Sequence, residues 1–209
     1  MQDNPLFSIM TRVQANASTT DLYANIANLQ AALQEYHQHA SGPLTVPTGV
    51  TNAWQQLSLS QLESFNASEL MQQNRTNQAH IQYKFTALFY PGSPTPQYTQ
   101  QMSNESYISI SASVMAPTSR GSITLLSSSP EDSPGINLNV FQASIEQCFP
   151  LLISHQYYNT TADQFTAIQA FKLIRQLFRA PSLTALTIGP NDGEVSPGPS
   201  VQSSADILE

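Results

Sequence analysis

The stretch SRGSITLLSSSPEDSPGINLN, residues 119–139, decides the fold of the middle of the chain. A turn at 119–121 leads into a short run of alternating residues, and a proline-flanked turn then runs toward Asn137 and Asn139. Glycine and proline mark turns because one accepts positive φ and the other presets φ near −65°. The pattern therefore predicts a short strand over 121–127, enclosed by two turns.

Two further strands are predicted upstream of this stretch. In HIQYKFTALFY (80–90) and YISISASVM (107–115), apolar residues alternate with polar ones, which is the period-two pattern of a half-buried strand. Between them, PGSPTPQ (91–97) reads as a loop. Strands so close in sequence pair most simply antiparallel.

Three helices are predicted around these strands. The segment 20–39 carries apolar residues at spacings of three and four, 58–73 offers Ser60 and Glu63 as a capping box, and 161–179 has the clearest helical pattern. The stripe of the first helix consists of Leu22, Ile26, Leu29, Leu33 and Tyr36. In the third helix, Thr161 and Gln164 would form the capping box, and Phe165, Ile168, Phe171, Leu173 and Leu177 would line the apolar side. The fold class predicted is α+β, an antiparallel sheet with helices packed on one face.

Composition limits the function classes. The chain has 209 residues, 40% hydrophobic and 10% charged, with a net charge of −7. A nucleic-acid or anionic-membrane partner is not expected, because both need a basic face. No run of about 20 apolar residues and no signal peptide is visible. Localisation is left open.

Sites for catalysis, metals and dinucleotides are missing from the sequence. The eight glycines are scattered, so no G-x-G turn is present for a pyrophosphate. No zinc-binding spacing and no G-x-S-x-G elbow occurs, and the single cysteine, Cys148, reads as a core residue. We therefore predict no catalytic residue and no metal site within these residues. Five N-x-S/T sequons are candidate glycosylation sites: Asn16, Asn66, Asn74, Asn104 and Asn159.

The stretch 116–139 resembles the substrate-binding domain of the glucose-methanol-choline (GMC) FAD-dependent oxidoreductases. Its S-R-G turn and its D-x-P-x-I-N-x-N turn stand in the family's order, and the helix 161–181, ending in Ala-Pro, is similar to the family's next element. The residues matching the two turns are Arg120, Gly121, Asp132, Pro134, Ile136, Asn137 and Asn139. The likeness is nearest to the fungal branch of aryl-alcohol oxidases and versicolorin B synthase.

The resemblance implies FAD and alcohol chemistry in an intact member. Such a member oxidises a CH–OH group, binds FAD through an N-terminal G-x-G-x-x-G domain, and uses a histidine from a motif after position 209. The chain would be a fragment that supplies the substrate-binding sheet, holds no cofactor alone and is inactive as an oxidase. Members of this branch are often secreted. Expected partners are a small alcohol or aromatic metabolite and the missing FAD-binding domain.

Site residues implied by the resemblance are few. The N-terminal MQDNP is similar to a flavin-adjacent loop, which implies cofactor contacts for Gln2, Asp3 and Asn4. Tyr83, Phe85 and Phe89 are candidates for the wall of a substrate pocket, with simple core packing as the alternative.

Residues 140–156, VFQASIEQCFPLLISHQ, interrupt the family pattern. They are either a genuine insertion or a translated intron, and the sequence of the transcript distinguishes the two. Two other functions stay open for the whole chain: a non-redox ligand-binding or cyclase-like protein of secondary metabolism, and a degenerate truncated product.

Overall fold

The computed structural model describes residues 4, 6–46, 49, 51–63, 78–90, 105–115, 117, 120–137 and 160–208. Residues 140–156, which interrupt the family pattern, lie outside the described residues. The strands are β1 (Leu6–Val13), β2 (Thr51–Gln55), β3 (Ile81–Thr86), β4 (Ser106–Val114), β5 (Ser122–Thr124), β6 (Gly135–Asn137) and β7 (Glu194–Ser196). The helices are α1 (Thr20–Ala24), α2 (Ile26–His39), α3 (Leu59–Glu63), α6 (Thr161–Phe178), α7 (Pro181–Thr184) and α8 (Ser204–Leu208), with 3₁₀ turns η1 (Ala15–Ala17), η2 (Pro43–Thr45) and η3 (Asn191–Gly193).

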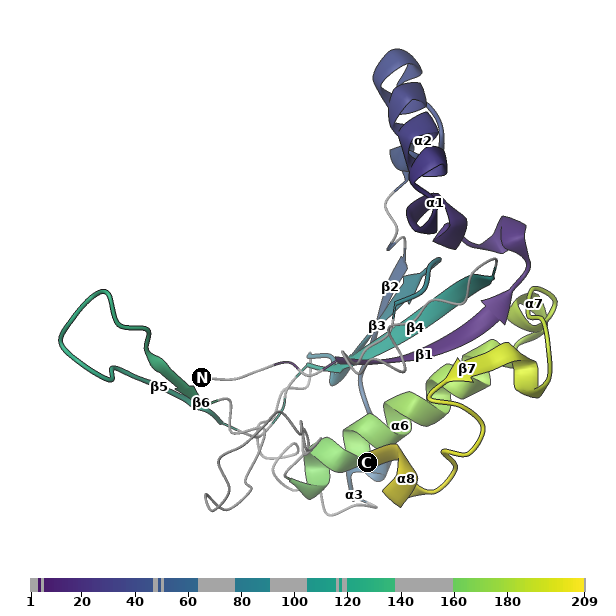
Figure 1. Cartoon of the computed structure of the whole chain (residues 1–209). Helices are drawn as coiled ribbons and strands as arrows, with labels where there is room; N and C mark the ends of the chain where they lie inside the picture. The colour runs from purple at the N-terminus through teal and green to yellow at the C-terminus, as the bar shows by residue number, and fades with distance from the viewer. Residues whose placement is uncertain are drawn as a thin grey trace.

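An antiparallel sheet of five strands, ordered β2-β3-β4-β1-β7, forms the centre of the molecule (Figure 1). The longest helix, α6, packs along one face of it. The α+β prediction is confirmed, including the antiparallel pairing of the strands near 80–90 and 107–115. The predicted strand at 121–127 shortens to β5, which pairs with β6 in a separate hairpin instead of joining the sheet.

The hydrophobic core lies between α6 and the sheet. Alternate residues of β1, β3 and β4 point toward the helix, because successive side chains of a strand face opposite sides. Ile9 and Ile110, which stand opposite each other in the β1–β4 pairing, are both almost fully buried there. The helix contributes Phe165, Ala170, Phe171, Ile174 and Phe178.

The buried stripe of α6 differs from the predicted one. Ile174 is 0% exposed and Phe178 4%, whereas Leu177, predicted to line the apolar side, is 38% exposed. The helix also begins one residue earlier than its predicted capping box, because the side chain of Thr160 accepts a hydrogen bond from the amide of Asp163 at 3.2 Å. The helix and the core positions of Phe165 and Phe171 are confirmed, whereas the predicted burial of Leu177 and the predicted cap were wrong.

The predicted helix 20–39 is broken in two. Asn25 has an extended backbone (φ −117°, ψ 114°), and its side chain accepts a hydrogen bond from the amide of Ala27 at 2.9 Å. Asparagine competes with helix continuation because it can cap a new helix with its own side-chain oxygen. The chain therefore ends α1 at Ala24 and starts α2 at Ile26, and α2 projects from the sheet (Figure 1).

A capping box opens α3, shifted by two residues from the predicted pair Ser60 and Glu63. The amide of Gln61 donates to Ser58 Oγ at 3.3 Å, and the Gln61 side chain accepts from the amide of Ser58 at 2.9 Å. Reciprocal bonds of this kind satisfy two amides that the first turn of a helix leaves without partners. Residues 64–73 of the predicted helix lie outside the described residues.

His80 links the start of β3 to the segment before α3. Its ring is 6% exposed, and its Nδ1 accepts a hydrogen bond from the amide of Leu57 at 2.9 Å. Burial lowers the pKa of His80 below its usual value, because desolvation disfavours the charged imidazolium. A proton on Nδ1 would also remove the acceptor that Leu57 uses.

This geometry predicts a loss of stability in mild acid. Above pH about 7.5, one unit over the ordinary pKa of histidine, His80 is neutral in both states and contributes no pH dependence. As the pH falls below that value, the unfolded chain binds a proton that the folded chain resists, so the free energy of unfolding declines. Urea unfolding between pH 7 and pH 5 measures this. The His80→Asn variant keeps an acceptor and cannot titrate, so its decline should be smaller; an equal decline would contradict the assignment.

Candidate functional site

The face of the sheet that points away from α6 carries hydroxyl groups. We call Ser8, Thr86, Ser109, Ser111 and Ser113 the hydroxyl face. The register places Ser8 opposite Ser111, and Thr86 opposite Ser109. All five side chains belong to buried residues, and Ser109 and Ser111 are 0% exposed. The central strand β4 is therefore buried on both faces, one apolar and one polar.

Most of the hydroxyl groups on this face form hydrogen bonds with other groups of the same chain. Ser8 Oγ and Ser111 Oγ lie 2.8 Å apart. Ser109 Oγ donates to the carbonyl of Leu88 at 2.8 Å and accepts from the amide of Tyr90 at 3.0 Å. Thr86 Oγ1 differs from these: it is buried and has no hydrogen-bond partner among the described residues. Because buried hydroxyls are normally paired, Thr86 is the member of this face with hydrogen-bonding capacity left for another group.

Arg12, Glu105 and Tyr107 form a polar cluster at one end of the same face. Arg12 stands opposite Tyr107 in the β1–β4 pairing, and its Nε donates to Glu105 Oε2 at 2.8 Å. The Tyr107 hydroxyl donates to the same oxygen at 2.7 Å. Burial, together with this bond and the charge of Glu105, raises the pKa of Tyr107 to about 12. Tyr107 is thus a neutral hydrogen-bond donor across the physiological range.

The three aromatic candidates for a pocket wall fall on opposite faces of the sheet. Tyr83 and Phe85 pack against the core beside α6, and Tyr83 is only 5% exposed. The Tyr83 hydroxyl donates to Gln55 Oε1 at 2.7 Å, and burial raises its pKa. Phe89 instead meets Tyr107 edge-on, with ring centroids 5.1 Å apart. The structure brings Tyr83 and Phe85 together and separates them from Phe89; their role in a pocket stays a prediction.

Of the predicted flavin-adjacent loop, Gln2 and Asp3 lie outside the described residues. Asn4 is exposed, and its amide nitrogen lies 3.7 Å from Met115 Sδ.

Of the five predicted glycosylation sequons, Asn16 is exposed in η1, and the other four asparagines lie outside the described residues. Neither the cofactor contact nor glycosylation is tested by these positions.

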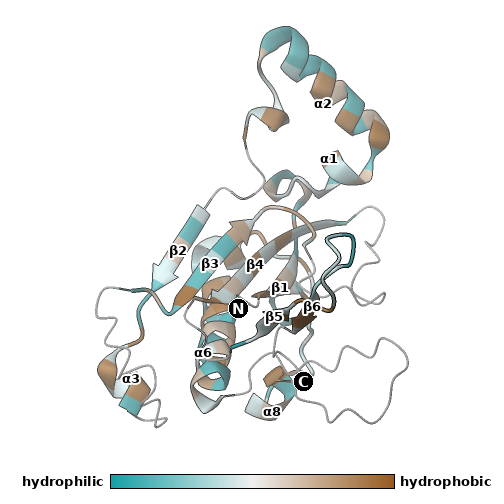
Figure 2. Ribbon diagram, turned by 90° about the vertical axis from the view of Figure 1, so that its left-hand side faces the viewer, coloured by the Kyte–Doolittle hydropathy of each residue, from teal (hydrophilic) through white to brown (hydrophobic). Residues whose placement is uncertain are grey.

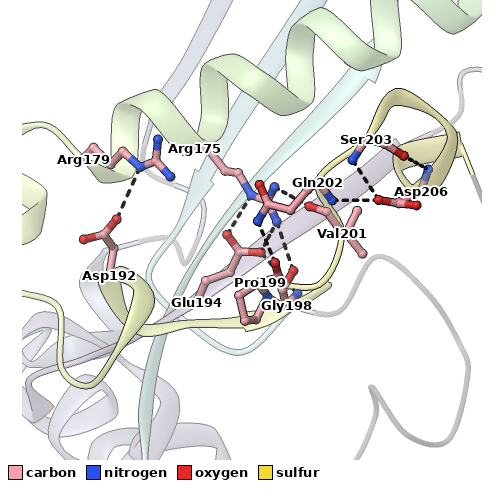
Figure 3. Close-up of polar contacts among 10 residues, drawn as sticks. All are labelled: Arg175, Arg179, Asp192, Glu194, Gly198, Pro199, Val201, Gln202, Ser203 and Asp206. Atoms are coloured by element: carbon pink, nitrogen blue, oxygen red, sulfur yellow. Dashed lines mark hydrogen bonds and ion pairs between the residues drawn. The ribbon is translucent and has the colours of Figure 1, made fainter.

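A buried ion pair fastens the C-terminal segment to α6 (Figure 3). Arg175 donates to both carboxylate oxygens of Glu194, at 2.9 and 2.7 Å, and also to the carbonyls of Gly198 and Val201. The side chains of the pair are 12% and 11% exposed. The guanidinium lies 4.5 Å from the centroid of the Phe171 ring. We call Arg175 and Glu194 the clamp.

A pocket of about 160 Å³ lies beside the clamp. Its charged groups are paired: Arg179 with Asp192 at 3.4 Å, and Arg175 with Glu194. Its lining consists of Thr11, Arg175, Phe178, Arg179, Asn191, Asp192, Glu194, Pro199 and Gln202. The pocket is thus electrically neutral and set into the structure that holds the C-terminal segment.

The glycine at position 193 is not placed to approach a phosphate. A phosphate cradle needs glycines whose backbone approaches the ligand. Gly193 packs against this chain instead, because an added Cβ there would lie 2.7 Å from the carbonyl oxygen of Arg12 and 2.8 Å from that of Ile188.

Within the described ranges, no three His, Cys, Asp or Glu residues cluster as metal ligands. No described helix has the length and apolar character needed to cross a bilayer.

Comparison with curated proteins identifies relatives in fungi. A glucose-methanol-choline family oxidoreductase of Annulohypoxylon moriforme is 27% identical over 88% of this chain and 27% of its own length. A glucose-methanol-choline oxidoreductase of Aspergillus terreus is 30% identical over 87% of this chain and 25% of its own length. Versicolorin B synthase of Aspergillus parasiticus is 24% identical over 100% of this chain and 28% of its own length. The chain thus spans about a quarter of the length of these relatives, and no protein-family model matches it.

Solved structures show the same fold. A formate oxidase variant of Aspergillus oryzae superposes with a TM-score of 0.70 at 16% identity, over 99% of this chain and 34% of that one. A fungal aryl-alcohol oxidase superposes with a TM-score of 0.55 at 15% identity, over 98% of this chain and 35% of that one. The chain is therefore homologous to one part of the glucose-methanol-choline oxidoreductases, the part with the fold of their substrate-binding domain.

Proposed function

We propose that the chain supplies the substrate-side wall of a flavoprotein that oxidises the CH–OH group of an alcohol. The observation that carries the proposal is the sheet with two buried faces. One face packs on α6, and the other presents the hydroxyl face and Tyr107. Most of these hydroxyls and the Tyr107 phenol already form hydrogen bonds within the chain, so Thr86 Oγ1, which has no partner among the described residues, is the group of this face that we assign to a substrate.

The FAD-binding domain and the catalytic base belong, in this proposal, to polypeptide other than residues 1–209. Two observations support it: the matched relatives are about four times as long as the region they share with this chain, and the backbone of Gly193 packs against this chain's own carbonyl groups. The chain alone should then bind no flavin. Its partners would be the FAD-binding domain and a small alcohol or aromatic metabolite.

The purified 209-residue chain can be incubated with FAD and then freed of unbound cofactor. Its absorbance spectrum tests whether the flavin site lies outside residues 1–209. We expect no flavin band and no oxidase turnover. A chain that retains flavin in a one-to-one ratio would contradict the proposal, because residues 1–209 would then contain a cofactor site of their own.

A non-redox role is a second candidate, favoured by the match of the whole chain to versicolorin B synthase. A wall of hydroxyl groups can orient a ligand for ring closure without a flavin. A saturable rise in melting temperature with an aromatic metabolite, in flavin-free protein, would support this role over the redox one.

A further inference from the structure

The pocket beside the clamp is lined by a buried hydroxyl group that has no partner. Thr11 is 1% exposed and belongs to the lining, and its Oγ1 makes no hydrogen bond within the part of the chain that the structure describes. Thr11 lies between Ile9 and Val13 on the face of β1 that packs on α6, because every second residue of a strand points the same way. Buried hydroxyl groups are normally paired. Thr11 therefore offers a hydrogen-bond donor and acceptor to a molecule in this pocket.

The pocket has a buried floor and a polar rim. Hydrophobic and hydrophilic segments follow one another along α6 (Figure 2), and the pocket takes one residue of each kind from the end of this helix. Phe178 is 4% exposed and lies in the floor with Thr11, whereas the side chain of Arg179 is 69% exposed at the rim. Figure 3 shows Arg179 pointing toward Asp192 of η3. A mostly buried cavity with a few polar groups around it is typical of small-molecule sites.

The side chains of the rim have hydrogen-bonding capacity left. Arg179 uses only its Nε, in the 3.4 Å contact with Asp192 Oδ2, so its two Nη atoms have no partner among the described residues. Gln202 donates from Nε2 to the carbonyl of Pro199 at 2.6 Å, and its Oε1 accepts from no described residue. The rim thus presents both donors and acceptors above the hydroxyl of Thr11.

Charge and size select the class of ligand. Both arginines of the lining are paired with carboxylates, so an anion would meet Asp192 and Glu194, and a cation would meet Arg175 and Arg179. A neutral hydroxyl group avoids both conflicts, and it can donate to an acceptor and accept from a donor at the same time. The volume of about 160 Å³ is roughly ten times the 10–15 Å³ that one water molecule needs, so the pocket has room for several heavy atoms.

We propose that the pocket beside the clamp binds a small neutral polyol, a short carbon chain or ring with a hydroxyl group on most of its carbon atoms. One ligand hydroxyl pairs with Thr11 Oγ1 at the floor, and others pair with Arg179 and Gln202 at the rim. The site lies on the α6 face of the sheet, whereas Thr86, which we assign to the substrate of the proposed oxidation, lies on the opposite face. The proposal therefore does not rest on the proposed function.

Saturation-transfer difference NMR of the 209-residue chain with xylitol tests the proposal. Melting temperature is a poor readout here, because osmolytes raise it for folded proteins in general. The wild type should give a signal that saturates with xylitol concentration. Thr11→Val keeps the shape of the side chain and removes its hydroxyl, so it should weaken binding about tenfold. Arg179→Ala should also weaken binding, since it removes the donors of the rim.

Stability separates a binding role of Thr11 from a structural one. In urea unfolding, Thr11→Val should be at least as stable as the wild type, because the change breaks no hydrogen bond within the chain. A clear loss of stability would overturn the proposal, as would a xylitol signal that never saturates. Saturable binding of acetate in place of xylitol would show that the pocket takes an anion instead. Binding that survives Thr11→Val but is lost in Thr86→Val would place the polyol on the hydroxyl face and equally contradict the assignment.

Discussion

Replacing Arg175 by alanine is expected to lower the free energy of unfolding by about 3–5 kcal/mol. The guanidinium is the partner of a carboxylate that is almost fully enclosed, with the side chains of Arg175 and Glu194 12% and 11% exposed. Its removal leaves the Glu194 charge and two backbone carbonyls without their donor. Urea unfolding followed by circular dichroism measures the change.

Arg179→Ala is the matched control for this prediction. The side chain lies one turn further along α6, pairs with Asp192 at 3.4 Å and is 69% exposed. An exposed pair of this kind contributes about 0–1 kcal/mol. Equal losses in the two variants would contradict the burial of the clamp. A double-mutant cycle with Glu194→Ala should further show a large coupling energy for Arg175 and Glu194.

Ile174→Ala is expected to cost about 2–5 kcal/mol of unfolding free energy. Its side chain is 0% exposed between α6 and the sheet, so truncation leaves a cavity in a packed core. Leu177→Ala removes a side chain of equal size that is 38% exposed, and should cost clearly less. The two variants also distinguish the observed face of α6 from the face predicted from sequence. A larger loss for Leu177→Ala would show that the helix packs with the other face.

The strands β3 and β4 and the helix α6 were predictable because the apolar residues of each recur with a clear period. The strand β1 was missed, although Phe7, Ile9 and Val13 alternate toward the core as the rule requires. The strand β2 has no such signal, because most of its residues are exposed at the sheet edge. Three-residue β7 depends on the clamp and on pairing with β1, which are tertiary contacts that local sequence does not encode.

The candidate site was less predictable than the fold. The alternation in β4 was interpreted as one buried and one solvated face, yet all nine residues are buried. Serine is usually an exposed residue, so Ser109 and Ser111 gave no sign of burial. The clamp joins residues 19 positions apart, and only the bend of the chain after α7 brings them together. The break between α1 and α2 does have a local signal in the sequence, because Asn25 is an asparagine and asparagine is a strong helix cap.

The central claim is that these residues form the substrate side of a flavoprotein whose cofactor domain and catalytic base are encoded next to them. The coding sequence that flanks the region for residues 1–209 tests this most directly. The account predicts an upstream frame with a strand–G-x-G-x-x-G–helix pattern and a downstream frame with an H-P-x-G-T motif. Transcripts that extend in neither direction and contain neither motif would contradict it.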